Sequence, residues 1–226
     1  MIESDWKSNP RSSSGAGSHR VRPMVQCATY PDLLTNLPTV ERVLNDHASD
    51  LGHDRIAYRN HVYRVVNLCL AVAGDSPVEL EKLAVAAVFH DLGIWTNHTF
   101  DYIAPSVSLA HEHLATRRLT DWVPQVEAMI VNHHKVTSSR ADGSSLVESF
   151  RRADWIDVSC GLRRFGLPRT VVASVIAAWP DAGFHRRLVA LTMASVVEAP
   201  AQPSANGQVV TETGPDVVTT RRAARS

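Results

Sequence analysis

Helical periodicity is the feature of this sequence that most restricts its fold. From about residue 38 to about residue 197, apolar residues recur at intervals of three and four, and no segment alternates apolar and polar residues convincingly. Such spacing gives a helix one apolar face, whereas a half-buried strand requires alternation with a period of two. The sequence therefore predicts an all-α helical bundle.

Proline, serine, threonine and glycine mark the expected helix ends. Proline is favoured in the first helical turn, serine and threonine cap N-termini, and glycine often follows a C-terminus. Ser76 with Pro77, Pro105 and Thr120 therefore predict helix starts, and Gly74 predicts a helix end. The expected helices span about residues 38–50, 54–73, 77–91, 105–118, 121–134, 145–160, 168–178 and 184–197.

The two ends of the sequence differ in composition from the part between them. Residues 1–30 include the polar, Gly/Ser-rich stretch SNPRSSSGAGSHRVRP, and residues 199–226 are similarly rich in small and polar residues. Such segments bury too little apolar surface to offset the entropy lost on ordering. We therefore expect a disordered leader over residues 1–30, one helical domain over residues 31–198, and a disordered tail over residues 199–226.

Charge and cysteine content disfavour several classes of protein. The 23 Lys and Arg residues balance the 23 Asp and Glu residues, so nothing indicates a nucleic-acid surface. The three cysteines are far apart, the N-terminal residues contain no apolar signal segment, and no apolar run is long enough to cross a membrane. We expect a cytoplasmic protein without a nucleic-acid or membrane partner.

The expected 54–73 and 77–91 helices direct three chemically active side chains inward. Apolar residues lie four, seven and eleven positions after His61, which places His61 on the buried face of its helix. Taken alone, an inward histidine is more often a satisfied core residue than a ligand. His90 and Asp91 end the most apolar helix, and packing explains this pair less readily, because burying an unpaired charge costs on the order of several kcal/mol.

Two later helices contribute the same residue types. His133 and His134 follow apolar residues at helical spacings, so at least one of them should point inward. Asp154 lies four residues after Phe150 on an apolar stripe, and Asp157 is the alternative carboxylate on that helix. The helical phases do not decide between His133 and His134, and Asp157 remains the alternative to Asp154.

The 105–118 helix offers a further candidate. His111 shares a face with apolar residues and is favoured over His113, although a surface position for His111 is equally compatible with the pattern.

Four helices that each direct His or Asp toward one core favour a metal centre, and imidazole with carboxylate suits Mn, Fe, Co, Ni or Zn. A structural zinc site would use cysteine instead. The candidate ligands are His61, His90, Asp91, His111, His133, His134 and Asp154.

The order His…His-Asp…Asp resembles the HD-domain superfamily of metal-dependent phosphohydrolases. His61, the adjacent His90 and Asp91 in HDLG, and Asp154 in ADWID carry this resemblance within residues 50–160. It implies an all-α HD-domain bundle in which these four residues bind one divalent metal ion.

The additional histidines resemble those of superfamily members that bind two metals. In such proteins a second metal lies beside the first, and Asp91 would bridge the two. His133 or His134, and also His111, are placed in the order that would serve the second metal. The chain lacks the GYP signature expected of cyclic-dinucleotide phosphodiesterases, so the resemblance does not extend to cyclic di-GMP.

The resemblance implies an enzyme that hydrolyses a small phosphorylated molecule or nucleotide. A divalent metal lowers the pKa of a bound water toward about 7 and polarises the phosphoryl oxygen. Asp91 is the candidate proton acceptor, and Lys135 and Arg59 are candidates for holding phosphate. Arg151 and Arg152 are further candidates, although a solvated surface role is the more common one for any single arginine.

Other functions use the same residue types. Some proteins of the superfamily are di-iron oxygenases with six His or Asp ligands, for which this chain would need His111. Others are lyases or hydratases that act on small molecules. A binding module without turnover is a third class, and the complete ligand set argues against it.

The segment that follows Asp91 contains several aromatic residues. HDLGIWTNHTFDY could form a lid in which Trp95, Phe100 and Tyr102 surround a substrate, although core packing is the more common role for Trp95. His98 is not expected to be a ligand. Tyr58 lies about one turn before His61 and could border or fill the pocket.

Overall fold

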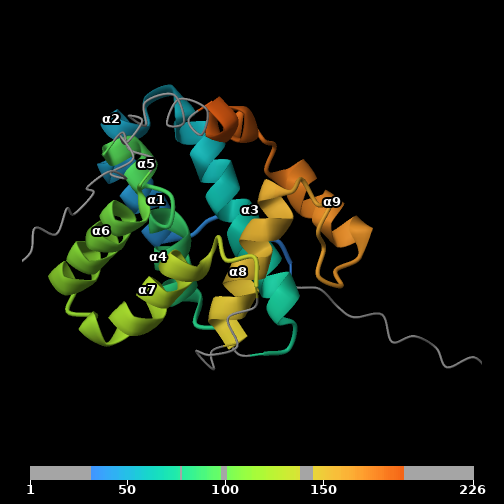
Figure 1. Ribbon diagram of the computed structural model, residues 1–226, viewed down its shortest axis with the longest axis horizontal. Coiled ribbons are helices and arrows are strands. Elements are labelled where there is room, and N and C mark those ends of the chain that lie inside the picture. Colours follow the sequence, from blue (N-terminus) through green and yellow to red (C-terminus); the bar gives the residue numbers. More distant parts are fainter. Residues whose placement is uncertain (1–31, 77, 98–100, 138–144, 191–226) are drawn as a thin grey trace, which may run out of the picture.

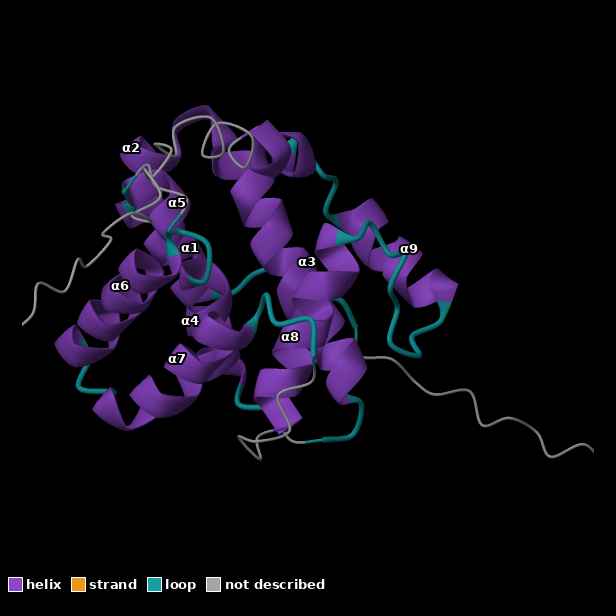
Figure 2. Cartoon of the chain, viewed as in Figure 1, coloured by secondary structure: helices purple, strands orange, loops and turns teal. Residues whose placement is uncertain are grey.

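The computed structural model describes residues 32–76, 78–97, 101–137 and 145–190, and this part of the chain is helical without any strand (Figure 2). The α-helices are α1 (Pro38–Asp46), α2 (Ala48–Leu51), α3 (Arg55–Ala73), α4 (Leu80–Phe89), α5 (Gly93–Thr96), α6 (Ile103–Thr116), α7 (Val123–Asn132), α8 (Ser145–Val158) and α9 (Arg169–Ala178). Two short 3-10 helices, η1 (Gly52–Asp54) and η2 (Thr120–Trp122), precede α3 and α7. Residues 184–190 are also helical. The predicted all-α fold is confirmed.

Helices α3 and α8 form the centre of the bundle. They pack side by side and make the most extensive contact between any two described elements (Figure 1). Helices α4 and α7 pack together and contact α3 and α8, whereas α9 contacts α3. Helix α6 covers α4 and α7, and α1 packs on α4. The junction of α3, α4, α7 and α8 thus brings together segments that are far apart in the sequence.

Helix α3 is buried over most of its 19 residues. It ends at Gly74, whose φ of +58° lies in the left-handed region that favours glycine, so the predicted C-terminus is correct. Several polar side chains are buried along this apolar helix, among them Asn60, His61, Arg64 and Asn67. Since buried polar groups require partners, these residues indicate where the bundle departs from simple apolar packing.

Some predicted helix boundaries differ from the observed ones. Helix α4 begins at Leu80, so Ser76 does not cap it, and Pro77 lies outside the described residues. Thr120 belongs to η2 instead of capping α7, and Pro105 is the third residue of α6. The short helix α5 was not predicted. Cap-forming residues alone do not fix where a helix begins, since tertiary context routinely overrides local preference.

The predicted disordered ends, residues 1–30 and 199–226, lie outside the described residues. The last predicted helix, 184–197, is described only as far as residue 190, where it is helical. None of the described helices combines the length and the apolar character that crossing a membrane requires.

Candidate metal centre

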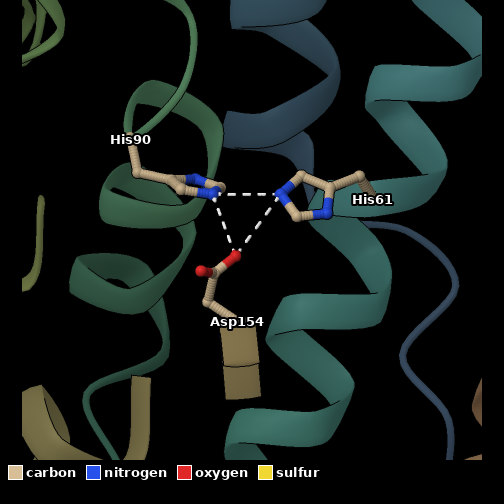
Figure 3. A group of neighbouring side chains, drawn as sticks. All are labelled: His61, His90 and Asp154. Atoms are coloured by element: carbon tan, nitrogen blue, oxygen red, sulfur yellow. Dashed lines mark hydrogen bonds and ion pairs between the residues drawn. The ribbon is translucent and has the colours of Figure 1, made fainter. Parts of the chain in front are cut away.

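Five buried side chains converge where α3, α4, α7 and α8 meet. His61 lies on α3, His90 and Asp91 directly follow α4, His133 directly follows α7, and Asp154 lies on α8. Each of these residues is at most 2% exposed. Figure 3 shows His61, His90 and Asp154 pointing toward one another from three separate elements.

The HDLG segment turns sharply at the end of α4. The Leu92 amide donates to the carbonyl oxygen of Phe89, and the Ile94 amide donates to that of Asp91. Gly93 lies so close to α6 that an added Cβ would be 2.5 Å from the backbone oxygen of Tyr102. This glycine therefore permits the close contact between α5 and α6 directly after the His-Asp pair.

Nitrogen and oxygen atoms of the five residues face one another at short range. The Nε2 atoms of His61 and His90 are 3.0 Å apart. Asp91 Oδ2 lies 3.5 Å and 3.4 Å from these two nitrogens, and Asp154 Oδ1 lies 3.8 Å and 3.7 Å from them. The other oxygen of Asp91, Oδ1, lies 3.3 Å from His133 Nε2. The two oxygens of Asp91 thus face different histidines.

Hydrogen bonds at Nδ1 orient all three buried imidazole rings. His90 Nδ1 lies 2.8 Å from the carbonyl oxygen of Ala87, and His133 Nδ1 lies 2.5 Å from that of Ile130. A carbonyl oxygen only accepts, so both nitrogens donate. His61 Nδ1 likewise donates to the carboxylate of a further residue at 2.7 Å. In the neutral rings each Nε2 therefore carries a lone pair, and all three lone pairs face the carboxylates of the cluster.

This chemistry fits a bound cation. Asp91 Oδ1 and Asp154 Oδ1 are buried and have no hydrogen-bond partner among the described residues, although buried carboxylate oxygens ordinarily have one. A divalent ion would accept both the oxygen and the nitrogen lone pairs. The ligand atoms lie within 4.8 Å of one another in three groups: His61, His90 and Asp154; His90, Asp91 and His133; and His133, His134 and Asp154.

Burial and neighbouring charge act in opposite directions on the ionisable groups. Burial would raise the pKa of Asp91 and Asp154, but the adjacent histidines hold both pKa values below the usual range. Burial would lower the pKa of His61, but its hydrogen bonds to Asp157 and Asp91 raise that pKa to about 9. Without metal, a proton on His61 balances the acids at neutral pH, and a bound cation would displace it.

Asp157 lies behind His61 and not among the converging ligands. Its Oδ2 accepts the hydrogen bond from His61 Nδ1, and buried Arg64 binds both of its oxygens at 2.5 Å and 3.0 Å. Burial would raise the pKa of Asp157, but His61 and Arg64 lower it to about 2. Arg64 was not among the residues predicted from the sequence. Its position three residues after His61, on the same face of the helix, was the available signal.

His134 and Tyr102 border the cluster. The Tyr102 hydroxyl contacts the imidazole of His134 and lies 3.5 Å from His133 Nε2. Tyr102 is buried, whereas His134 is exposed at the C-terminal end of α7. The cluster therefore has a more exposed edge beside His134.

The other aromatic candidates belong to the core or lie outside the described residues. Trp95 is buried and donates from Nε1 to Asp54 Oδ2 at 3.1 Å. Tyr58 is buried and its hydroxyl donates to the carbonyl oxygen of Val88 at 2.9 Å. His98 and Phe100 lie outside the described residues.

The structure does not bring His111 or Arg59 to the cluster. His111 Nε2 lies 3.0 Å from Glu127 Oε2 in a partly exposed contact between α6 and α7. Arg59 binds the carboxylate of Glu41 at 2.6–3.1 Å. It precedes His61 by two residues, and side chains two positions apart on a helix do not share a face. Proximity in sequence was therefore a misleading criterion for Arg59.

Lys135 remains the candidate cation nearest to His134 in the sequence. It is exposed, and its carbonyl oxygen accepts a hydrogen bond from Arg151 at 2.8 Å. Arg151 is buried and binds Glu148 through two nitrogens, and Arg152 also binds Glu148 at 2.8 Å. Both arginines are thus already engaged with a carboxylate.

Comparison with known families matches the HD domain to residues 58–159. This stretch contains all five converging residues, together with Arg64 and Asp157. Neither curated proteins nor solved structures gave a match to the chain.

Proposed function

We propose, from the premise that residues 58–159 form an HD domain, that the protein is a metal-dependent phosphohydrolase acting on a small phosphorylated molecule or nucleotide. HD domains bind divalent metals and are generally enzymatic. One observation carries the proposal: three buried imidazoles donate from Nδ1 and direct Nε2 toward two buried carboxylates.

The ligand groups suggest how metal would be held. His61, His90, Asp91 and Asp154 would bind one divalent ion, either Mn, Fe, Co, Ni or Zn. The other two groups, His90 with Asp91 and His133, and His133 with His134 and Asp154, would offer ligands for a second ion. A bound metal supplies a water whose pKa is lowered toward about 7 and polarises a phosphoryl oxygen.

The protein's own groups would complete the reaction. Asp91 would accept the proton of the attacking water when its Oδ1, which has no hydrogen-bond partner among the described residues, is not bound to a second ion. Substrate would approach beside His134, the exposed member of the candidate ligand groups. Lys135, directly after His134, would bind a phosphate oxygen there.

The hydrolase has better support than the di-iron oxygenase. The oxygenase hypothesis needed His111 as its sixth ligand, and His111 contacts Glu127 instead. The lyase or hydratase hypothesis uses the same cluster, and no described contact favours it.

The proposal is tested by measuring hydrolysis of a panel of phosphate esters and nucleotides. The protein is loaded with each candidate metal in turn. We expect the wild type to hydrolyse at least one class of ester and Asp91→Asn to be about 100-fold slower or worse, because a general base typically contributes that much. His47→Gln is the matched control, since His47 pairs with Asp50 at the surface. Inactivity of the loaded wild type on every ester, or full activity of folded Asp91→Asn, would overturn the hydrolase proposal. Two irons per chain in such inactive protein would instead favour the oxygenase.

A further inference from the structure

We propose that residues 179–187, beyond the stretch matched to the HD domain, form a positioning element that holds the ring of His61 for metal binding. The inference rests on the proposed metal centre and concerns a different part of the chain. After α9 the chain turns back, and the helix of residues 184–190 lies near the first turns of α3 (Figure 1).

Phe184 covers one face of the His61 ring. The two rings are stacked, with centroids 4.0 Å apart and an interplanar angle of 11°. Phe184 is 1% exposed, so the stack is fully buried. Asp157 holds Nδ1 of the same ring, and Nε2 faces the metal cluster. Phe184 therefore fixes one face of the His61 ring and Asp157 fixes its Nδ1 edge. The remaining nitrogen, Nε2, is left to bind the metal.

The turn at residues 179–180 supports Asp157 indirectly. Arg64 Nη1 donates to the carbonyl oxygens of Trp179 and Pro180 at 3.0 Å and 3.3 Å, while its other nitrogens bind Asp157. Nδ2 of Asn60, on α3, also donates to the Pro180 carbonyl at 2.7 Å. The backbone of this turn therefore orients Arg64, and Arg64 orients the acid that binds His61.

A second contact joins the element to the backbone of α8. His185 Nε2 donates to the carbonyl oxygen of Asp157 at 2.8 Å. Asp157 is thus held through its side chain by Arg64 and through its backbone by the residue after Phe184. The contacts of this element with the centre therefore converge on the pair His61 and Asp157.

Both ends of the element are anchored outside the metal centre. The Trp179 ring stacks on Tyr63 at 4.3 Å with an interplanar angle of 12°. Arg187 Nε lies 2.9 Å from Asp54 Oδ2, just before α3. Because the ends are fixed by other contacts, a change at Phe184 can alter His61 without releasing the whole segment.

Groups that orient a metal ligand typically change metal affinity 10- to 100-fold when they are replaced. Phe184→Leu in the full chain keeps an apolar side chain but removes the stacked ring. We expect it to bind Co²⁺ about tenfold more weakly than the wild type, as followed by visible absorption. Val189→Ala is the matched control, because Val189 lies in the same helix and is 62% exposed, and its Co²⁺ affinity should be unchanged.

A spectroscopic readout separates positioning from general destabilisation. The ¹⁵N shifts of the His61 ring in metal-free protein report the surroundings of its two nitrogens, and they should change in Phe184→Leu, which removes the stacked ring, and in Asp157→Asn, which alters the partner of Nδ1, but not in Val189→Ala. Unfolding temperatures of the metal-free variants establish that each is folded, and Phe184→Met replaces Phe184→Leu if the latter is not.

The outcomes are distinct for the two proposals. A wild type that takes up no Co²⁺ would overturn the metal centre itself. A wild type that binds Co²⁺, with unchanged affinity and unchanged His61 shifts in the folded Phe184 variant, would overturn the positioning role while leaving the metal centre intact.

Discussion

The Nε2 atoms of His61 and His90 face each other at 3.0 Å, and the Nδ1 atom of each ring donates a hydrogen bond away from the contact. Two nitrogens held in this way must share a proton or a cation. The buried carboxylates of Asp91 and Asp154 add negative charge beside them. The pair therefore links the packing of α3 against α4 to the proposed metal centre.

Metal binding should stabilise the folded protein. The cluster is assembled only by folding, so a free metal concentration 100 times the Kd should add about 2.7 kcal/mol to the free energy of unfolding. Urea unfolding with metal and with chelator measures this difference. His90→Ala should abolish it and His47→Gln should retain it. An equal difference in His90→Ala would contradict the assignment of His90 as a ligand.

Replacing Arg64 should destabilise the protein far more than replacing a surface arginine. Arg64→Met leaves the buried carboxylate of Asp157 without its cation, which typically costs about 3–5 kcal/mol. Arg152→Met removes a partly exposed ion pair with Glu148 and should cost about 1 kcal/mol or less. Chemical unfolding of both variants gives the comparison. Similar losses in the two variants would show that the Arg64 pair is not the buried anchor described above.

Gly93→Ala should disturb the contact between α5 and α6. The added Cβ would lie 2.5 Å from the Tyr102 carbonyl oxygen and 2.9 Å from Ser106 Oγ, and backbone must shift to relieve the first contact. Such overpacking typically costs about 1–3 kcal/mol. Because Gly93 follows Asp91 closely, metal affinity should fall as well. A variant with wild-type unfolding temperature and wild-type metal affinity would be inconsistent with this tight approach.

His113 should make stability depend on pH. Burial, followed by the charge of Arg117, lowers its pKa from 6.5 to about 4 in the folded state. Between these values the unfolded chain binds the proton more readily, so the contribution of neutral His113 is complete above about pH 6.5 and is lost as the pH falls toward 4. The difference in unfolding free energy between the wild type and His113→Gln, measured with chelator present, should therefore shrink across this window. A difference that is constant from pH 7 to pH 4 would contradict the lowered pKa.

Sequence periodicity was sufficient to predict the class of fold and to predict that several candidate ligands point inward. Burial of His61 and Asp154 follows from their phase relative to neighbouring apolar residues, which is a local property of one helix. The HDLG segment was informative because its adjacent His90 and Asp91 carry the resemblance to HD domains, whereas the close contact of its glycine with α6 is seen only in the structure.

Contacts between helices that are distant in the sequence could not be predicted from the phase of residues on single helices. Asp154 and Asp157 share a helical face, and only the placement of α8 against α3 makes Asp157 the partner of His61 Nδ1. His111 has a partly apolar phase, but the packing of α6 on α7 directs it to Glu127. The stacking of Phe184 on His61 depends on a reversal of the chain after α9, and no local sequence pattern predicts this reversal.

The central claim is that the buried histidines and aspartates bind metal, and metal content per chain tests it most directly. The measurement is elemental analysis of protein purified without chelator and then dialysed against Mn²⁺, Fe²⁺, Co²⁺, Ni²⁺ or Zn²⁺ under anaerobic conditions. We predict one or two tightly held ions per wild-type chain and their loss in folded His61→Ala and His90→Ala variants. A wild type that retains no ion from any of these solutions, or variants that retain as much as the wild type, would contradict the account.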